Sequence, residues 1–451
     1  MKGIYLTNFA VKGIKTIDEW VSLSFYKKTI ARDINTQEYN IKGIYGMNGS
    51  GKSGIVTAVD ILKNVLMNPG YLNNPIVQKN LHEIINKKMS ELCIEVEFIS
   101  NLAEPILHLG YSLTLARDAV GKYVISYEKL SIKKAKDNEM IVCEIRDGEF
   151  DFVVDEETDI FAQEFLKKTA NLLSANSICS LLMEKVLISE EIGCKKDEST
   201  FYLMLGMLWL FSTKLYICME QSDDHREHIA YTAFDYVDNG NFNISNLMKS
   251  FVHSDRFNLK IITGTKNIVP IDKYENFKET VNKLSGFIRI FKSDLLGIEI
   301  DSKINKDVYM CDLIMVYDSY KIHAEYESTG IKKLIRLYAY LKKMVEGEIV
   351  FIDEFDSNLH DVYLCALLEY LMEYGEGQIC FTTHNVGPMD ILKRNKKSID
   401  FLSVDHKIYS WKTNGNYSPS KLYRSGMIEG SPFNVDSIDF IGVFDSGEED
   451  K

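Results

Sequence analysis

A glycine-rich segment near the start of the chain has the residue types that are needed to bind phosphate. Gly46, Gly51, Lys52 and Ser53 fit the spacing Gly-x-x-x-x-Gly-Lys-Ser. The glycines allow backbone conformations that direct several N–H groups at phosphate, the lysine neutralises the β and γ phosphates, and the serine ligates Mg²⁺. We therefore expect a nucleoside triphosphate and magnesium to bind here, through Asn48, Gly49, Ser50, Gly51, Lys52 and Ser53.

Two adjacent carboxylates follow an apolar run in the second half of the chain. Asp353 and Glu354 come directly after Ile349–Ile352. Such a run is typical of a buried strand in a parallel sheet, and α/β sheets keep their ligand sites at the carboxyl ends of their strands. We interpret Asp353 as a magnesium ligand, directly or through water, and Glu354 as the base that orients and deprotonates the attacking water.

Another apolar run, residues 379–381, is followed by two threonines and then by His384. A single histidine after a strand is often a surface or capping residue. The order of phosphate loop, acidic strand and histidine strand favours a functional role instead, and we expect His384 to sense the γ phosphate.

The surrounding patterns predict the elements that position these residues. An apolar run at 41–45 predicts a strand that enters the loop, and helical spacing at 55–66 predicts a helix whose amides face phosphate. Four short alternating runs, at 92–98, 106–115, 123–130 and 140–145, predict an antiparallel meander. Helical spacing then dominates residues 159–291, and alternating strands and helices from 297 onward predict a mainly parallel sheet covered on both faces.

These motifs together resemble the ATPase head of the ABC superfamily, in the branch that contains SMC, RecF and OLD-like proteins. The opening strand Leu6-x-Asn8-Phe9 and the segment Thr383-His384-Asn385 match in order with the loop and the acidic pair. The resemblance implies an α/β P-loop NTPase fold with an antiparallel β subdomain and a helical insertion. We expect the first part of the head at 1–155, the insertion at 156–292 and the second part at 293–451.

The resemblance also implies that the site is divided between two copies. It identifies Ser328 and Gly330 as a signature motif that reaches the nucleotide of the partner in a homodimer or a higher oligomer. By composition alone the same segment is a helix N-terminus with a serine cap, and its exposed amides also suit phosphate. The signature has Glu327, Thr329 and Ile331 where transporters have leucine, glycine and glutamine, so a transporter cassette is not expected. A Q-loop glutamine has no clear position, since no strand marks Gln78.

Three functions are compatible with such a site. The first is an ATPase, converting ATP and water to ADP and phosphate, that acts as a sensor or switch for a separate effector such as a nuclease in anti-phage defence. The alternative is a DNA-repair ATPase like RecF or SMC that binds DNA in an ATP-dependent way. A kinase or GTPase is disfavoured because Asn305-Lys306-Asp307 is followed by Val308 and not by the guanine-reading aspartate.

The composition limits these readings. A net charge of −13 and a pI of about 5.3 argue against a surface that grips DNA mainly through its phosphates. The basic runs 133–136 and 393–397 are interpreted as solvated faces, with nucleic-acid contact as the minor alternative.

The 8 cysteines include no Cys-x-x-Cys pair and suit a reducing cytoplasm. The apolar segment 201–219 is too short before its polar residues to span a bilayer, so we expect a buried helix and no membrane association. His225 and His228 are interpreted as part of a polar turn and not as a metal site.

Overall fold

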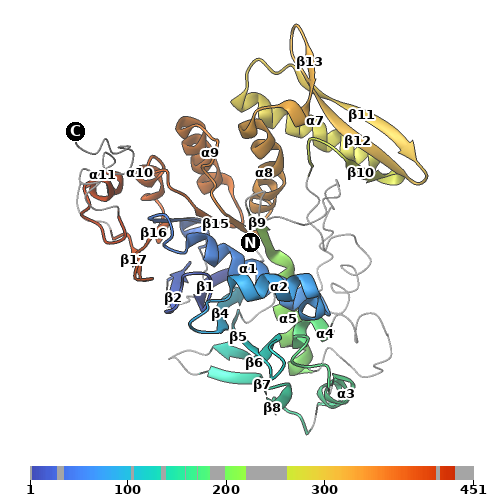
Figure 1. The fold of residues 1–451 in the computed structure, drawn as a ribbon, viewed down its shortest axis with the longest axis vertical. Helices are drawn as coiled ribbons and strands as arrows, with labels where there is room; N and C mark the ends of the chain where they lie inside the picture. The colour runs from blue at the N-terminus through green and yellow to red at the C-terminus, as the bar shows by residue number, and fades with distance from the viewer. Residues whose placement is uncertain are drawn as a thin grey trace, which may run out of the picture.

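The computed structural model describes residues 3–27, 35–102, 106–133, 139–157, 159–169, 171–182, 199–219, 262–412 and 417–431; His225 and His228 lie outside them. A six-stranded sheet occupies the centre of the molecule, with the strand order β17-β16-β3-β15-β14-β9 (Figure 1). All its neighbours pair in parallel except β16 and β17. The strands are β3 (Ile41–Gly46), β9 (Leu215–Cys218), β14 (Ile349–Ile352), β15 (Gln378–Thr382), β16 (Ile399–Leu402) and β17 (Ile408–Ser410).

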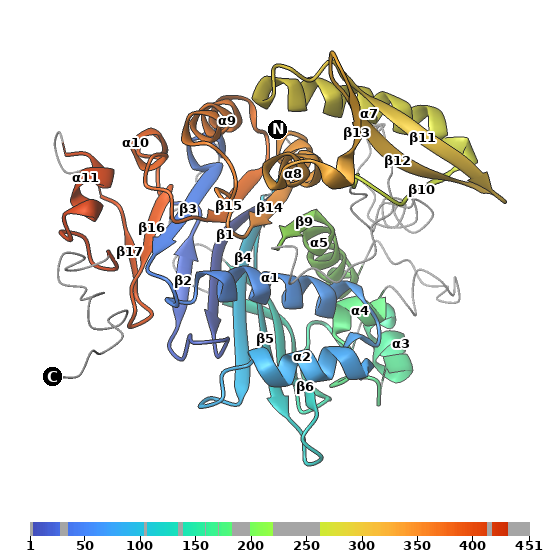
Figure 2. The same cartoon turned by 45° about the horizontal axis from the view of Figure 1, so that its top comes forward.

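Helices cover the central sheet on both faces, which explains why its strands are continuously apolar. In β14, Ile349 and Phe351 join the core that contains α1 and α5, whereas Val350 and Ile352 join the core on the opposite face. Figure 2 shows α1 on one side of β14 and β15 and α8 and α9 on the other. The helices are α1 (Lys52–Met67), α5 (Thr200–Lys214), α8 (Thr329–Val345), α9 (Asp361–Tyr374), α10 (Met389–Leu392) and α11 (Pro419–Arg424).

A seven-stranded antiparallel sheet packs against α1 and α5 and confirms the predicted meander. Its order is β2-β1-β4-β5-β6-β7-β8, and its apolar residues share one core with those two helices. The short helices α2 (Pro75–Ile84), α3 (Ile160–Thr169) and α4 (Ile178–Leu182) contribute to the same core. The strands are β1 (Ile4–Lys12), β2 (Val21–Ser24), β4 (Glu91–Ser100), β5 (Leu107–Arg117), β6 (Tyr123–Lys133), β7 (Glu139–Arg146) and β8 (Glu149–Val153).

A third unit, here called the β lobe, comprises residues 262–326. It contains β10 (Asn267–Pro270), α7 (Tyr274–Phe291), β11 (Gly297–Asn305), β12 (Val308–Val316) and β13 (Lys321–His323). Figure 1 shows it at the end of the molecule opposite β7 and β8. Its core includes Ile331, Leu334 and Ile335 of α8, so α8 joins the β lobe to the central sheet. Single 3₁₀ turns occur at Gln37–Tyr39, Tyr71–Asn73, Ile271–Lys273 and Ala324–Tyr326.

The structure confirms the α/β class with an antiparallel subdomain, and the described parts of the segment 156–292 lie in three places. α3 and α4 pack on the antiparallel sheet. α5 leads directly into β9 of the central sheet, and β10 and α7 belong to the β lobe. α5 leads into the central sheet because β9, the four-residue strand that follows it, pairs in parallel with β14, which lies far along the chain. Within the described residues, every helix is too short or too polar to cross a membrane.

A buried ion pair joins the loop strand to its neighbour. Lys42 Nζ in β3 lies 2.5 Å from Asp400 Oδ2 in β16, and the two side chains are 2% and 0% exposed. Asp400 Oδ1 also accepts a hydrogen bond from Ser410 Oγ at 2.6 Å. The pair fixes β3 against β16, although burying two charges costs much of what their attraction returns.

Candidate nucleotide site

The phosphate loop joins β3 to α1 at the carboxyl end of the parallel strands. Gly49 and Gly51 take left-handed backbone angles, with φ of 78° and 102°. A Cβ on Gly51 would lie 2.7 Å from Ile17 Cγ1, so conformation and space both require glycine there. Gly51 is the N-cap of α1 and makes no side-chain cap, which leaves the amides of the first turn to a phosphate.

The loop also holds a buried hydroxyl suited to a ligand. Ser50 Oγ is buried and has no hydrogen-bond partner among the described residues, an arrangement that is costly unless a bound group completes it. Ser53 lies in the first turn of α1 and is half-buried. Asn48 and Gly49 are exposed at the tip of the loop. The loop thus fits the phosphate-binding role expected from its sequence.

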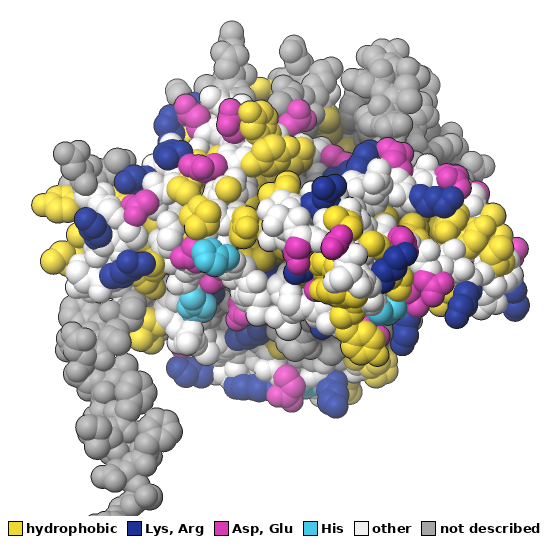
Figure 3. Space-filling model, turned by 90° about the horizontal axis from the view of Figure 1, so that it is seen from above, with side chains coloured by type: hydrophobic (Ala, Val, Ile, Leu, Met, Phe, Trp, Pro, Cys, Tyr) yellow, Lys and Arg dark blue, Asp and Glu magenta, His cyan; other side chains and the backbone are white. Residues whose placement is uncertain are grey.

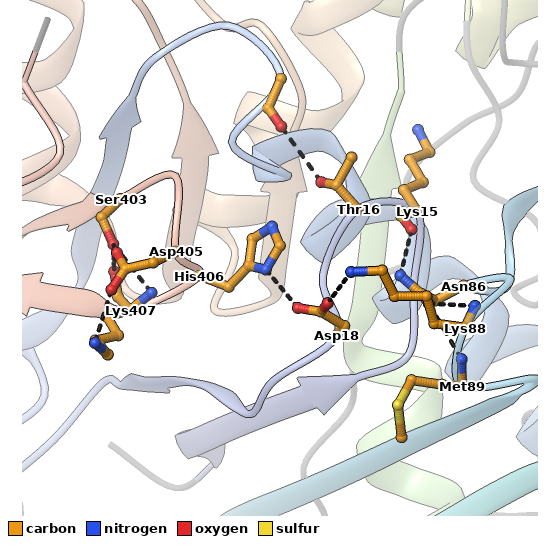
Figure 4. A network of polar contacts seen from close by, with 11 residues as sticks. Lys15, Thr16, Asp18, Asn86, Lys88, Met89, Ser403, Asp405, His406 and Lys407 are labelled. Carbon is orange, nitrogen blue, oxygen red and sulfur yellow. Dashed lines mark hydrogen bonds and ion pairs between the residues drawn. The ribbon is translucent and has the colours of Figure 1, made fainter.

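A turn after β1 supports the loop from below (Figure 4). Thr16 Oγ1 donates to Gly49 O at 3.3 Å. Asp18, in the same turn, accepts from Lys88 Nζ at 3.0 Å and lies 2.9 Å from His406 Nδ1. These hydrogen bonds, Lys88 first, lower the pKa of the Asp18 carboxyl. The sequence does not reveal this support, because the four segments that meet here are far apart along the chain.

Lys52 points into the loop. Its ammonium donates to Gly46 O at 2.8 Å and to Met47 O at 2.9 Å, and the residue is 7% exposed. Burial lowers the pKa of Lys52 to about 8, and the carboxylates that follow β14 act in the opposite direction. The loop and the acidic end of β14 therefore form one electrostatic site.

Thr382, the last residue of β15, connects the two acidic residues. Its hydroxyl donates to Asp353 Oδ1 at 2.5 Å and accepts from Glu354 N at 2.8 Å. This contact exists because β15 lies between β3 and β14 in the sheet. The sequence indicates the strand but not the role of its threonine, since strand order is not visible in the sequence.

Asp353 and Glu354 differ in their surroundings. Asp353 is 6% exposed, whereas Glu354 is exposed and has a left-handed φ of 47°. A non-glycine residue in that conformation costs about 1–3 kcal/mol and persists where its surroundings hold it. Asp353 is thus suited to a cation inside the site, and the Glu354 side chain to a water that enters from solvent.

His384 and Asp356 complete the charged groups around Lys52. His384 follows β15 and is exposed; desolvation and then the charge of Lys52 lower its pKa, while Asp356 and Asp353 act the other way. A neutral imidazole at pH 7 donates one hydrogen bond and suits a phosphate oxygen. Asp356 also acts on Lys52. The sequence signal that would have indicated it is its position two residues after Glu354.

The signature residues lie at the start of α8. Ser328 is the N-cap, and its Oγ accepts from Ile331 N at 3.4 Å, as a serine-capped helix predicts. Thr329 Oγ1 donates to Asn358 Oδ1 at 3.2 Å, and a Cβ on Gly330 would lie 2.7 Å from Asn358 O. The signature therefore packs on the loop after β14 of its own chain, and these contacts do not join it to the phosphate loop.

A lysine of α8 makes a second link to that loop. Lys333 Nζ donates to Glu354 O and to Ser357 Oγ. α8, which carries the signature, is therefore hydrogen-bonded to the backbone of Glu354, the expected base. Gln78, in contrast, lies in α2 and is buried, with its amide bonded to Leu72 O, Tyr123 O and Tyr123 N at 2.7–2.8 Å. Its contacts are structural and lie outside the nucleotide site.

Comparisons with known proteins are consistent with this site. Residues 250–390, less than half of the chain, match a family model described as "AAA domain, putative AbiEii toxin, Type IV TA system". The matched span includes the signature, the acidic pair and His384 but not the phosphate loop. No curated protein matches the sequence.

Several solved structures are similar at low identity. The SMC head domain from Thermotoga maritima is 12% identical, with 91% of this chain and 100% of that chain covered and a TM-score of 0.35. The recombination mediator protein RecF of the RecFOR pathway is 12% identical in two structures that cover 91% of this chain. They cover 99% of RecF-ATPrS with a TM-score of 0.38 and 100% of RecF-ATP with a TM-score of 0.36. At these values the function is inferred from the geometry of this chain alone.

Proposed function

We propose that this chain, an SMC/RecF-like ABC-type ATPase by its fold and motifs, binds ATP with Mg²⁺ and hydrolyses it to ADP and phosphate. The observation that carries the proposal is the convergence of Lys52, Asp353 and Glu354 at one edge of the parallel sheet. Burial lowers the pKa of Lys52, whereas the charges of both carboxylates act to raise it. The Thr382 hydroxyl forms hydrogen bonds with both acidic residues. Phosphoryl transfer depends mainly on such positioning and charge.

Each residue then has one task. The amides of the loop and the first turn of α1 hold the phosphates, and Lys52 neutralises the β and γ phosphates. Ser53 and Asp353 would hold Mg²⁺, which binds through one or two protein oxygens together with phosphate and water and neutralises the developing charge. Glu354 orients the attacking water and takes its proton. His384 contacts the γ phosphate.

We further propose that the site is completed by a second copy. Ser328 is exposed at the N-terminus of α8, where a capping hydroxyl and unpaired amides form an anion site. Its helix is anchored to the loop after β14 and not to the phosphate loop. In a symmetric dimer, Ser328 and Gly330 of each copy would close the nucleotide site of the other.

The proposed role of the dimer is a switch for a separate effector, such as a nuclease, in defence against phage. The family description supports this context, since it names a toxin of a type IV toxin–antitoxin system. This proposal includes a separate effector protein and a higher oligomer of this chain. The genes that neighbour the gene for this chain provide the first check on the effector. A nuclease encoded beside this chain supports the switch.

DNA binding is the alternative that the charges disfavour. The face seen in Figure 3 mixes acidic, basic and hydrophobic side chains without a continuous basic field. Residues 134–136 lie outside the described part of the chain. The other basic run is neutralised locally through Lys393–Asp390 at 3.5 Å, Arg394–Glu369 at 2.8 Å and Lys396–Glu38 at 2.5 Å. ATP-dependent duplex binding that weakens steeply with salt would favour the repair function instead.

The function is tested by ATP turnover in the unaltered protein, Lys52→Ala and Glu354→Gln. Lys52→Ala should lose ATP binding. Glu354→Gln should keep ATP affinity, lose about 100-fold or more in turnover because the base is gone, and accumulate as an ATP-bound dimer. The neighbouring acidic variant Glu348→Gln is the matched control, since Glu348 bonds Lys214 at 3.0 Å at the other end of β14. Unchanged turnover in Glu354→Gln would reject the assignment.

A further inference from the structure

Tyr317, directly after β12 in the β lobe, belongs to the core that this lobe shares with α8. Its N–H donates to Tyr320 O at 2.9 Å, and the two rings stack with centroids 4.7 Å apart. Lys292 Nζ lies 5.0 Å from the centroid of the Tyr317 ring. The residue is 5% exposed, and burial, as the largest cause, raises the pKa of its hydroxyl. The hydroxyl is therefore a permanent donor at physiological pH.

That hydroxyl reaches the residue before the signature serine. Tyr317 donates to Glu327 Oε1, while Glu327 Oε2 accepts from Ser328 N at 3.2 Å. The backbone of Glu327 is also fixed, since its N–H donates to Ala324 O at 3.3 Å. The Glu327 carboxylate thus connects Tyr317 of the β lobe to the backbone N–H of Ser328. Ser328 is the N-cap of α8, and the signature starts there.

The position of Glu327 matters because a carboxylate repels phosphate. It lies beside the N-terminus of α8, whose amides attract any anion. A mobile carboxylate there would compete with an incoming phosphate for the same amides. Held by Tyr317, it instead fixes Ser328 N and leaves the amides of Thr329 and Gly330 to the ligand.

We propose that Tyr317 is a positioning residue for the signature. Through Glu327 it sets the orientation of Ser328 and restrains a carboxylate next to the phosphate-binding end of α8. The β lobe thereby controls the half of the site that each copy offers to the nucleotide of the other. This role rests on the proposed ATP-dependent dimer. It adds Tyr317 and Glu327 as the pair of residues that couples the β lobe to the signature.

The test uses the full chain in the Glu354→Gln background, where hydrolysis does not consume the dimer. Tyr317→Phe removes only the hydroxyl. Tyr320→Phe is the matched control, because it makes the same change in the same turn and leaves the ring that stacks on Tyr317. Two quantities are measured for each variant: the affinity for a fluorescent ATP analogue at a concentration where the chain is monomeric, and the dissociation constant of the ATP-bound dimer.

Tyr317→Phe should weaken the ATP-bound dimer about tenfold, as expected for loss of one charge-assisted hydrogen bond. Its monomer should bind the ATP analogue like the parent, since the phosphate loop is unaltered, and Tyr320→Phe should match the parent in both quantities. A Tyr317→Phe dimer as tight as the parent overturns the positioning role, and so does an equal loss of ATP affinity in the monomer. If the parent itself fails to dimerise with ATP, the proposed function fails first.

Discussion

The most informative substitution for the chemistry is Thr382→Val, which keeps the shape of the side chain and removes its hydroxyl. Two hydrogen bonds are lost, one to Asp353 Oδ1 at 2.5 Å and one from Glu354 N at 2.8 Å. A bond to a charged group contributes about 1.5–3 kcal/mol and a neutral one about 1 kcal/mol. Because Asp353 is buried, water does not readily replace the hydrogen bond that its carboxylate loses.

We expect Thr382→Val to lower the free energy of unfolding by about 3 kcal/mol, measured by denaturant titration without nucleotide. Turnover should fall by about 100-fold, because the base and the metal ligand lose their common support. The matched control is Thr383→Val in the next position. Thr383 Oγ1 accepts only one described hydrogen bond, from Asn385 N at 2.9 Å, so it should cost about 1 kcal/mol. Equal effects of the two substitutions on stability and turnover would refute the reasoning.

Two further predictions concern charge. Because the Lys52 pKa is about 8 and phosphate prefers the ammonium, affinity for ATP should be nearly full at pH 7 and fall as the pH rises through 8. The loss from pH 7 to 9 should be about tenfold, with proton uptake on binding seen by calorimetry in two buffers; equal affinities at pH 7 and 9 would contradict this. Lys42→Met should lower the free energy of unfolding by about 3–5 kcal/mol, since it leaves Asp400 buried and unpaired. Lys42→Met with Asp400→Leu should recover most of that loss, and a single variant as stable as the unaltered protein would argue against the ion pair.

The sequence predicts the elements around the candidate nucleotide site well where a local pattern is enough. A strand, a loop and a helix around Lys52, and an apolar strand ending in Asp353 and Glu354, are each visible within about 20 residues. The structure has these elements as β3, α1 and β14. The carboxyl ends of parallel strands meet at one edge, so their convergence follows from the class of sheet.

What the sequence does not predict depends on contacts between distant segments. The roles of Thr382 and Thr16 require the order of strands in the sheet and the packing of the β1–β2 turn, neither of which has a periodic signal. The segment 215–218 shows why a strand within the expected insertion is not visible in the sequence. Its four apolar residues continue the pattern of α5, and only pairing with β14 makes them a strand.

A site divided between two copies can be tested by mixing two inactive variants. Lys52→Ala keeps its signature and loses its phosphate loop, whereas Ser328→Arg keeps the loop and loses the signature. Each alone should be inactive. Mixed in equal amounts, half of the dimers would contain one intact site, so turnover should recover to about a quarter of that of the unaltered protein. A mixture no more active than its components, or full activity of Ser328→Arg alone, would contradict the account.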